Sequence, residues 1–474
     1  METRSIKKEL AIRGMKVLHF ICSVALFVGC WYLYYKKMYA TANHPKGEIL
    51  LALVYALVLL LLERTYDAYN LGYRKLSENI YSLTLSQVIA AGALWVITCL
   101  IFMKLTNPLP LMGLAAVQFA INLCWGVLAN KIYTKLNMNK RTIVLYGKES
   151  DLTRTEELTG LTTKFNVQKT VCVSGMQYSE VEKLMEGFEA VVVCGVEATV
   201  RNGIAKYCIE KGIVGFVAPH VGDVIMQGAR HVRGFSVPIM TVRRAEPAIE
   251  YLFVKRAFDI IVSALGLIIT SPLFLIVSIA IKLCDGGSIF YKQVRLTKDN
   301  KEFKILKFRS MREDAEKDGV ARLSSGEKDT RITPIGRIIR ACRLDELPQL
   351  INIFVGQMTI VGPRPERPEI AAQYIEFIPA FSLRLQVKAG LTGYAQVYGK
   401  YNTDPHDKLE MDLMYINKMS VIEDLRLMVA TVKILFMRES TDGISEGQTT
   451  AMAKAEEAPK EIPEEAPAEG SEEA

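Results

Sequence analysis

The chain has 474 residues, of which 50% are hydrophobic and 23% charged, and its formal net charge is +7. A mean hydropathy of +0.17 is high for a soluble protein and indicates a membrane protein with large aqueous parts. The last 24 residues hold eight Glu and two Lys, so the rest of the chain carries +13, which suits anionic partners such as phospholipids and nucleotide diphosphates. No basic stripe or nucleic-acid-binding motif is present, which argues against nucleic acid as a partner.

Nine cysteines are scattered along the chain, without a Cys-x-x-Cys motif and without clustered histidines. This pattern argues against a disulfide framework and against a zinc site. We therefore expect the aqueous parts of the protein to face the reducing cytoplasm.

Residues 1–130 are predicted to form four transmembrane helices. Apolar stretches occupy residues 17–35, 49–62, 83–103 and 109–128. Three of them approach the roughly 20 residues that cross a bilayer core. The second has only 14 residues and by itself fits an interfacial helix, but its membrane neighbours favour spanning.

The distribution of Lys and Arg predicts the orientation of these helices. The N-terminal segment, the second loop and the segment after the fourth helix carry twelve Lys and Arg, against four in the other two loops. Basic loops remain on the cytoplasmic side of a membrane. We expect the N-terminus and everything after residue 128 to be cytoplasmic.

Residues 141–245 follow the pattern of an α/β domain. Short β-branched runs alternate with helical segments, as in a parallel Rossmann-like sheet, at residues 142–147, 171–173, 190–195 and 213–217. Gly147 lacks the further glycines of a dinucleotide-binding loop, so we expect no cofactor there. Tyr207 and Lys211 match the Tyr-x-x-x-Lys pattern of short-chain dehydrogenases, but such a short pattern is common by chance and we expect a plain helix surface.

Two adjacent carboxylates, Asp345 and Glu346, lie in a segment rich in arginine. A lone pair of this kind is usually a solvated helix face. Here Arg337, Arg340 and Arg343 precede it, so the local charge is positive enough to hold a polyphosphate. Carboxylates beside arginines are the groups that Mg²⁺-dependent phosphoryl chemistry requires.

A further arginine, Arg364, lies between Pro363 and Pro365. The two prolines restrict the backbone dihedral angles on either side of it. This makes the guanidinium group a preorganised fork for an anion rather than a mobile surface charge.

Six short sequence motifs, including the two just described, lie between residues 251 and 443. They are Lys255-Arg256-Ala257-Phe258-Asp259, Ser271-Pro272, Lys307-Phe308-Arg309-Ser310-Met311, Leu344-Asp345-Glu346-Leu347-Pro348-Gln349, Gly362-Pro363-Arg364-Pro365 and Gly390-Leu391-Thr392-Gly393-Tyr394-Ala395-Gln396-Val397. In this order they resemble the catalytic core of the bacterial sugar transferase family, the polyprenyl-phosphate hexose-1-phosphate transferases. We therefore assign residues 250–445 to a mostly α-helical catalytic domain. The resemblance extends to the long form of the family, which has four N-terminal membrane helices and a Rossmann-like middle domain.

The resemblance implies roles for the two carboxylates. Asp345 would attack the phosphorus next to the sugar in a UDP-sugar, forming a phosphosugar-aspartyl enzyme and releasing UMP. Undecaprenyl phosphate would then take the phosphosugar from the enzyme. Glu346, together with Asp345, would hold Mg²⁺, which neutralises the diphosphate.

Several basic residues are expected to bind phosphate beside this pair. They are Arg364 between its prolines, Arg340, Lys307 and Arg309. The alternative for each is a surface charge or one that binds lipid headgroups.

Residues 258–283 are predicted to form a re-entrant membrane helix. The stretch is long and apolar enough to cross, but basic residues flank both ends, and crossing would export the catalytic segment away from nucleotide sugars. Ser271 and Pro272 lie near its middle, where the proline removes a backbone hydrogen bond and a nearby hydroxyl can cap the freed carbonyl. A kink in a fully spanning helix is the alternative.

Lys255, Arg256 and Asp259 lie where this hairpin would enter the membrane interface. We expect them to anchor the hairpin or to meet the lipid phosphate rather than to carry out chemistry. The acidic segment 450–474 has almost no core-forming side chains and is predicted to be disordered.

The sequence thus predicts a membrane enzyme that starts a cell-surface polysaccharide or glycoprotein glycan on undecaprenyl phosphate. It would lie in the bacterial inner membrane as a homodimer, with its catalytic domain on the cytoplasmic face. A membrane-anchored sugar-nucleotide dehydratase or epimerase, and a non-catalytic scaffold, are the alternatives. The sequence does not identify the sugar.

Overall fold

The computed structural model describes residues 2–36, 45–72, 75–136, 140–148, 151, 154–155, 165–232, 236–312, 329, 331–399 and 403–435. The acidic segment 450–474, predicted to be disordered, lies outside these residues. The described chain forms two compact units, the first made of Met1–Val242 with Ile422–Leu435 and the second of Arg243–Val421.

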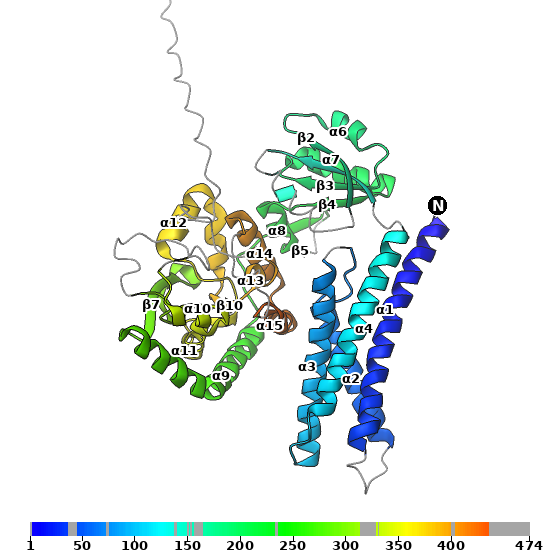
Figure 1. Ribbon diagram of the computed structural model, residues 1–474. Helices are drawn as coiled ribbons and strands as arrows, with labels where there is room; N and C mark the ends of the chain where they lie inside the picture. Colours follow the sequence, from blue (N-terminus) through cyan, green and yellow to red (C-terminus); the bar gives the residue numbers. More distant parts are fainter. Residues whose placement is uncertain are drawn as a thin grey trace, which may run out of the picture. The chain divides into compact units, whose positions relative to one another are not determined.

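The first unit begins with a bundle of four helices, as the apolar stretches predicted (Figure 1). The helices are α1 (Glu2–Cys30, continued by a π-helical turn, Trp31–Tyr35), α2 (Pro45–Thr65), α3 (Leu76–Phe102) and α4 (Leu109–Lys135). Aromatic and leucine side chains fill the bundle, and the Phe27 ring stacks on that of Tyr55 with 3.8 Å between centroids. Outward leucines such as Leu53 and Leu100 are 61% and 70% exposed, as expected for side chains that face lipid.

Four helices in the described part of the chain are long and apolar enough to cross a membrane. They contain Lys8–Tyr35, Leu76–Phe102, Leu109–Lys135 and Ile249–Asp285. Helix α2 is not among them, because Glu48 and Arg64 lie in its first and last turns and shorten its apolar part. Spanning by α2 stays a prediction.

The last described helix, α15 (Val421–Leu435), packs against this bundle through residues of the first unit. Tyr66 Oη donates to the backbone oxygen of Val429 at 3.0 Å, and Tyr81 Oη donates to that of Lys433 at 3.2 Å. The buried Lys433 Nζ donates to Ser82 Oγ at 2.7 Å. The end of the segment assigned to the catalytic domain therefore contributes to the membrane bundle.

The first unit also contains a parallel four-stranded sheet with the order β2-β1-β3-β4. Its strands are β1 (Lys140–Tyr146), β2 (Phe165–Cys172), β3 (Ala190–Cys194) and β4 (Val214–Val217), and its helices are α6 (Tyr178–Met185), α7 (Ala198–Lys211) and α8 (Val221–Gln227). A short antiparallel hairpin, β5 (Arg230–Val232) and β6 (Ile239–Thr241), follows. The predicted parallel α/β arrangement is therefore present.

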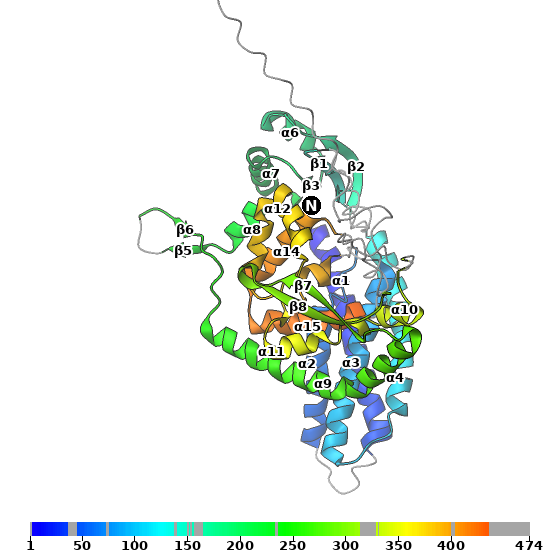
Figure 2. The ribbon, with the colours of Figure 1, turned by 90° about the vertical axis from the view of Figure 1, so that its left-hand side faces the viewer.

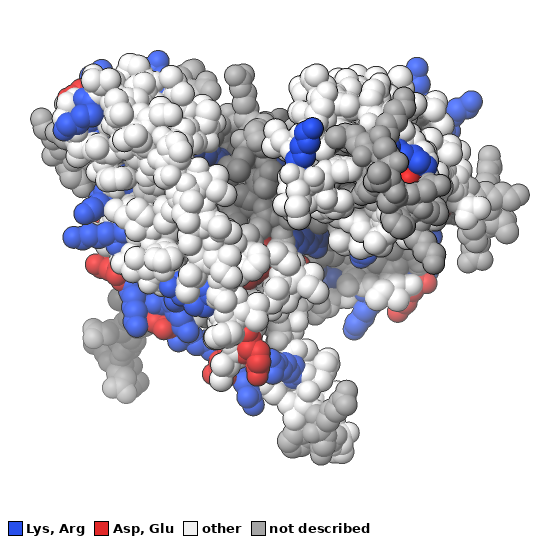
Figure 3. All heavy atoms as spheres, turned by 90° about the horizontal axis from the view of Figure 1, so that it is seen from below, with Lys and Arg blue, Asp and Glu red and all other residues white. Residues whose placement is uncertain are grey.

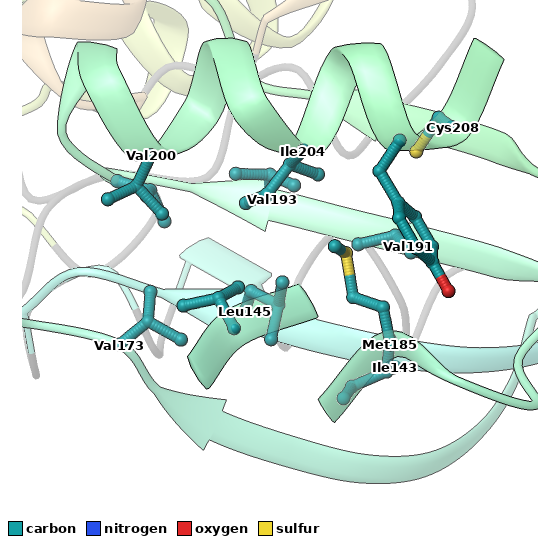
Figure 4. Packing of buried hydrophobic residues seen from close by; sticks show 12 residues of the cluster. Ile143, Leu145, Val173, Met185, Val191, Val193, Val200, Ile204 and Cys208 are labelled. Atoms are coloured by element: carbon teal, nitrogen blue, oxygen red, sulfur yellow. The ribbon is translucent and has the colours of Figure 1, made fainter. Parts of the chain in front are cut away.

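The core of this sheet lies between the strands and helices α6 and α7. Figure 4 shows Val200, Ile204 and Cys208 of α7 pointing toward Val191 and Val193 of β3. Together with Ile143, Leu145 and Met185, these side chains are almost fully enclosed. Such dense apolar packing explains why the β-branched runs were recognisable as buried strands.

Tyr207 lies in this core and is only 5% exposed. The expectation that the Tyr207 and Lys211 pair marks a plain helix surface was therefore wrong for the tyrosine. Its ring is needed for packing between α7 and the sheet, which also removes it as a candidate for dehydratase chemistry.

The second unit consists of a long apolar helix and a mostly helical body. Its elements are α9 (Ile249–Asp285), β7 (Phe290–Leu296), β8 (Glu302–Phe308), α10 (Pro334–Ala341), the 3₁₀ turn η5 (Leu344–Glu346), α11 (Gln349–Val355), β9 (Thr359–Val361), α12 (Pro368–Phe377), β10 (Gly390–Thr392), α13 (Tyr394–Tyr398) and α14 (Pro405–Lys418). Strands β7 and β8 are antiparallel, and β9 and β10 are parallel.

Helix α9 is bent, and Figures 1 and 2 show two limbs that meet at an angle. Pro272 lies inside the helix and has no backbone N–H for the carbonyl of Ile268. Ser271 Oγ donates to that same carbonyl oxygen at 2.7 Å. This is the hydroxyl cap that the Ser-Pro pair predicted, and it lets the helix continue through the bend.

Both limbs of α9 pack on the same body. In the first limb, Gly266 adjoins Leu350 of α11. In the second limb, Val277 and Ile281 pack with Phe308 of β8 and with other apolar residues of the body. The opposite face of α9 is apolar and exposed, as Ile269 at 74% and Ile276 at 62% illustrate. Figure 3 shows the protein from below. Much of the surface on this side is uncharged, and Lys and Arg lie mainly toward its margins.

Candidate active site

The carboxylate pair lies on the short turn η5, directly after α10. Thr333 Oγ1 caps the start of α10 by accepting a hydrogen bond from the backbone N–H of Gly336 at 2.9 Å. Arg343 ends the connection with φ = 53°, a left-handed conformation that a side chain with a Cβ rarely adopts. A strained residue beside a candidate site is typical of functional turns. Asp345 and Glu346 follow at once.

Glu346 is held by two cations. Its Oε1 accepts a hydrogen bond from Arg364 Nη2 at 2.7 Å and lies 3.5 Å from Lys307 Nζ. The Glu346 side chain is only 15% exposed. Burial opposes its ionisation, but the attraction of Arg364 and Lys307 is larger and lowers the pKa of Glu346 well below its ordinary value. Glu346 is therefore an ionised carboxylate with a fixed orientation.

Asp345 has no hydrogen-bond or ion-pair partner among the residues that the structure describes. It is half-buried, and the charges that act on it are those of Lys307, Glu346, Arg340 and Arg364. Burial, helped by repulsion from Glu346, raises its pKa above the ordinary value. The two adjacent carboxylates are thus chemically distinct, one tied to cations and the other available to a reactant.

Lys307, on strand β8, contacts Glu346, and its charge acts on both carboxylates. Burial lowers the pKa of its amine, while the two acids and the nearby arginines act in opposite directions. The structure thus brings together four of the predicted site residues, Asp345, Glu346, Arg364 and Lys307.

The Pro363-Arg364-Pro365 loop is fastened at each residue. Gly390 N donates to Pro363 O at 2.8 Å, Arg384 Nη2 donates to Arg364 O at 2.9 Å, and Arg295 Nη1 donates to Pro365 O at 3.1 Å. These bonds hold the backbone that presents the Arg364 guanidinium group to Glu346. The loop is preorganised, as the two prolines predicted.

Arg384 and Asp412 form a buried ion pair that the sequence analysis missed. The two side chains are 3% and 1% exposed, and Arg384 Nε donates to Asp412 Oδ2 at 2.8 Å. Burial raises the pKa of Asp412, and Arg384 counteracts this effect. One signal was available, since Asp412 falls on the apolar face of α14 between the buried Leu409 and Ile416.

The Gly390-Leu391-Thr392-Gly393 motif lies directly beside the same loop. A Cβ on Gly390 would come within 2.1 Å of the backbone nitrogen of Gly362. Only glycine allows strands β9 and β10 to approach this closely. Two motifs far apart in the sequence are therefore part of one structure.

Arg340 lies in the last turn of α10, and its charge acts on Asp345. Its Nη1 is buried and has no hydrogen-bond partner among the described residues. The same is true of Gln349 Nε2, at the start of α11, which the sequence analysis named only as part of a motif. Buried donors without acceptors are rare in proteins, and each indicates a missing partner.

Arg309 occupies a different place from the one predicted. It is buried and forms an ion pair with Asp285 at the end of α9. The charges with the largest influence on the pKa of Asp345 and of Glu346 are those of other residues. The structure thus does not bring Arg309 to the carboxylate pair, because its guanidinium group is needed where α9 meets the body.

Lys255, Arg256 and Asp259 join the first limb of α9 to the body. Lys255 Nζ donates to Val361 O at 2.9 Å, and the Arg256 guanidinium group donates to two backbone carbonyls near the end of α11, both at 2.8 Å. Asp259 Oδ1 accepts from the backbone N–H of Ile360 at 3.0 Å. All three bind backbone groups of the body, in keeping with an anchoring role.

A magnesium ion would have to use the carboxylate pair. Among the described residues there is no cluster of three or more His, Cys, Asp or Glu that could hold a metal. Magnesium commonly takes one or two carboxylates and completes its shell with water and substrate oxygens. The unpartnered Asp345 beside the ionised Glu346 fits this requirement.

The comparisons with known proteins agree with this site. The sequence model described as "Bacterial sugar transferase" matches residues 250–438, which contain every residue discussed above. The exopolysaccharide production protein PSS of Rhizobium leguminosarum bv. phaseoli is 40% identical over 190 residues, which are 38% of this chain and 94% of that protein. The chain belongs to the bacterial sugar transferase family.

Two longer relatives match over the same sugar transferase region. One is a UDP-glucose:undecaprenyl-phosphate glucose-1-phosphate transferase of Klebsiella pneumoniae, 40% identical over 39% of this chain and 41% of that protein. The other is a UDP-N-acetylgalactosamine-undecaprenyl-phosphate N-acetylgalactosaminephosphotransferase of Aeromonas hydrophila, 36% identical over 40% of this chain and 45% of that protein. The matched region spans less than half of either relative. Their names differ in the sugar.

Proposed function

We propose that this protein transfers a hexose-1-phosphate from a UDP-sugar to undecaprenyl phosphate, with release of UMP, through a covalent phosphosugar-aspartyl intermediate on Asp345. The product would start the synthesis of an exopolysaccharide, capsule, O-antigen or glycoprotein glycan. The observation that carries this proposal is the contrast within one dipeptide. Asp345 has no hydrogen-bond or ion-pair partner in the described part of the chain, while its neighbour Glu346 is held by Arg364 and Lys307.

In the first step, an Asp345 carboxylate oxygen attacks the phosphorus bonded to the sugar oxygen. The bond from this phosphorus to the oxygen that bridges the diphosphate breaks, and UMP leaves with the electron pair. In the second step, a phosphate oxygen of undecaprenyl phosphate attacks the same phosphorus. The bond to Asp345 breaks and the carboxylate is regenerated, so one site serves a soluble donor and a lipid acceptor in turn.

The positive groups around the pair support the first step. Lys307 and Arg364 already contact Glu346, and Arg340 carries a buried N–H that has no acceptor among the described residues. An oxygen of the diphosphate would supply that acceptor. Preorganised donors of this kind stabilise charge that develops on a transferring phosphoryl group. Magnesium bound by Asp345 and Glu346 would neutralise part of the diphosphate charge.

We further propose that α9 is a re-entrant helix. Its first limb is bonded to the body through Lys255 and Arg256, and its second limb ends at the ion pair of Asp285 with Arg309. A helix that crosses a bilayer separates its two ends by the thickness of the membrane. Bonds from both ends to one polar body, and the capped bend at Pro272, support an entry and exit on the same face.

The remaining features of the proposal concern location. The twelve-to-four excess of Lys and Arg supports a bacterial inner-membrane protein with a cytoplasmic catalytic unit. A homodimer is proposed because two-fold association is the commonest form among soluble oligomers.

Covalent catalysis is tested with radiolabelled UDP-sugar in the absence of lipid acceptor. Wild-type protein should retain label after denaturation, and Asp345→Asn should retain none and lose nearly all turnover. The exposed Glu369 of the same unit provides a matched control, so Glu369→Gln should behave as wild type. Labelled Asp345→Asn protein, or substantial turnover by it, would refute the assignment.

The sugar is tested by incubating membranes that contain the protein with a panel of UDP-hexoses and measuring UMP. One sugar should release UMP in a manner that depends on undecaprenyl phosphate and on Asp345. Dehydration or epimerisation of a UDP-sugar without UMP release would instead support the sugar-nucleotide dehydratase alternative.

A further inference from the structure

A series of buried polar side chains crosses the inside of the helical bundle in the first unit. It links α1, α3 and α4 with the segment after α2. His19, Ser23, Gln87 and Asn122 are at most 2% exposed, and Glu63 is 3% exposed. Polar groups in a membrane bundle are costly to bury and commonly mark a functional site.

The donor and the acceptor of each hydrogen bond in this series of side chains can be assigned. Ser23 Oγ donates to the backbone oxygen of His19 at 3.0 Å, so it accepts from Gln87 Nε2 at 2.9 Å. This leaves Gln87 Oε1 as the acceptor for Asn122 Nδ2, at 2.9 Å. Thr84 Oγ1 also accepts from Asn122 Nδ2 at 2.9 Å. The amide of Asn122 therefore turns its oxygen toward His19.

The orientation of Asn122 decides which nitrogen of His19 carries hydrogen. Asn122 Oδ1 lies 3.0 Å from His19 Nε2 and can only accept, so Nε2 bears the hydrogen. In a neutral imidazole the other nitrogen, Nδ1, is then an acceptor. It lies 2.9 Å from Tyr69 Oη, whose single hydroxyl hydrogen then goes to this nitrogen.

Tyr69 Oη also lies 3.3 Å from Glu63 Oε1. Two arrangements of hydrogen satisfy both contacts of Tyr69. With a neutral imidazole, Tyr69 donates to His19 Nδ1 and a protonated Glu63 donates to Tyr69. With an imidazolium, His19 Nδ1 donates to Tyr69 and Tyr69 donates to a Glu63 carboxylate.

The surroundings of Glu63 favour the first arrangement, in which Glu63 is a neutral acid. Tyr69 is the only hydrogen-bonding partner of the Glu63 side chain among the described residues, and Glu63 Oε2 is buried without any. On its own helix, the neighbouring Arg64 is exposed. On α15, Lys433 donates to Ser82 instead. A buried carboxylate without a cation is costly, so the protein favours the acid.

Uncharged side chains pack near the triad of Glu63, Tyr69 and His19. Tyr55, on the same helix as Glu63, has its hydroxyl 3.3 Å from Gln118 Nε2. Trp125 of α4 packs against His19 and Tyr69, with its ring centroid 4.7 Å from that of His19 and 5.4 Å from that of Tyr69. The indole shields the triad from other polar groups on that side.

We propose that Glu63 is an intramembrane proton-binding site that is occupied at neutral pH, with Tyr69 connecting it to His19. A proton can move along this path without any net change in charge. Glu63 gives its hydrogen to the Tyr69 oxygen, and Tyr69 gives its own hydrogen to His19 Nδ1. The result is a carboxylate and an imidazolium, and the reverse transfer restores the neutral pair.

Infrared spectroscopy of the full-length protein in lipid nanodiscs tests the proposal. The wild type should show a carbonyl band of a protonated carboxyl group that shifts in D₂O, and Glu63→Gln should lack this band. Glu48→Gln, on the other end of the same helix where Glu48 meets Lys36 at 3.3 Å, is the matched control and should keep it. A band that persists unchanged in Glu63→Gln would overturn the proposal.

Thermal unfolding provides a second, independent measurement. A Gln amide can donate to Tyr69 as the acid does, so Glu63→Gln should match the wild type in mildly acidic buffer. In mildly alkaline buffer it should be the more stable of the two, because only the wild type must ionise a buried acid. If Glu63→Gln is instead as unstable as Glu63→Ala at every pH, a carboxylate is required and the proposal fails.

Discussion

Glu346 in the second unit and Glu63 in the bundle are both nearly enclosed glutamates, yet their surroundings differ in sign. Arg364 and Lys307 hold Glu346, and their attraction outweighs the cost of burial. Glu63 meets only the neutral Tyr69 among the described residues. Burial therefore does not set the charge of a carboxylate by itself, because the balance depends on which cations the fold brings within a few ångströms.

The largest effect is expected when Arg364, one of the two cations that hold Glu346, is replaced. Arg364→Met should lower kcat by roughly 100- to 1,000-fold, the usual cost of losing one preorganised donor at a site of developing charge. Arg364 lowers the pKa of Glu346, so its loss should raise that pKa and move the acidic limb of the pH–rate profile to higher pH. UMP release measured across pH checks both effects. An unchanged acidic limb would mean that Glu346 does not titrate in catalysis.

The stability of the same region has a defined pH dependence. A carboxyl group whose pKa is lower in the folded state stabilises the fold above its unfolded pKa, and this contribution disappears as the pH falls. The wild type should thus lose more stability on acidification than Arg364→Met, in which Glu346 titrates nearer its ordinary value. Unfolding of the purified protein over a range of acidic buffers measures the difference.

The second largest effect is expected at the buried pair that supports the loop. Arg384→Gln leaves Asp412 buried without its cation, and breaking one side of such a pair costs about 3–5 kcal/mol. Replacing both residues, in Arg384→Gln with Asp412→Asn, should recover much of the stability. In both variants the backbone oxygen of Arg364 has lost the hydrogen bond from Arg384. The acidic limb of the pH–rate profile should therefore be shifted to higher pH in both, as in Arg364→Met.

An exposed ion pair provides the control for that experiment. Arg141 and Glu189 lie 3.9 Å apart and are each 55% exposed. Arg141→Gln should change stability by less than about 1 kcal/mol, since exposed pairs contribute little. Equal losses in Arg141→Gln and Arg384→Gln would contradict the interpretation of the Arg384 pair.

A smaller effect is expected at the bend of α9. Ser271→Ala removes the hydroxyl that caps the Ile268 carbonyl next to Pro272 and should cost about 1 kcal/mol. Pro272→Ala restores a backbone N–H and should straighten the helix, which lowers activity without touching substrate. Accessibility of cysteines at Lys255 and Ser288, in a background without native cysteines, reports whether both ends stay on one side. Labelling of the Ser288→Cys protein in intact cells would show that the helix spans.

The smallest effect is expected where α15 meets the bundle. Ser82→Ala removes the hydroxyl that accepts from the buried Lys433, and a net loss of about 1 kcal/mol is expected for one such bond. Thr134 Oγ1 lies exposed on α4 and provides a control in Thr134→Val, which should be neutral. Thermal unfolding of the full-length protein compares the two.

Much of the fold was predictable from local patterns. The apolar stretches became α1 to α4, and the β-branched runs became the parallel strands β1 to β4, because both signals depend on the periodicity of burial along the chain. The Ser271 and Pro272 pair even predicted the hydroxyl cap of its own bend. Tyr207 was misjudged because a pattern on a helix does not say which side of the helix faces the sheet.

The sequence by itself singled out the candidate site residues, since Asp345, Glu346 and Arg364 are recognisable from their neighbours in the chain. The tertiary structure alone decided how they differ. Arg309 was recruited to Asp285, Arg384 to the Arg364 loop and Lys307 to Glu346, all through contacts between distant segments. The physical reason is that the strength of a charge interaction depends on distance and on the surrounding dielectric, and neither is written in the order of residues.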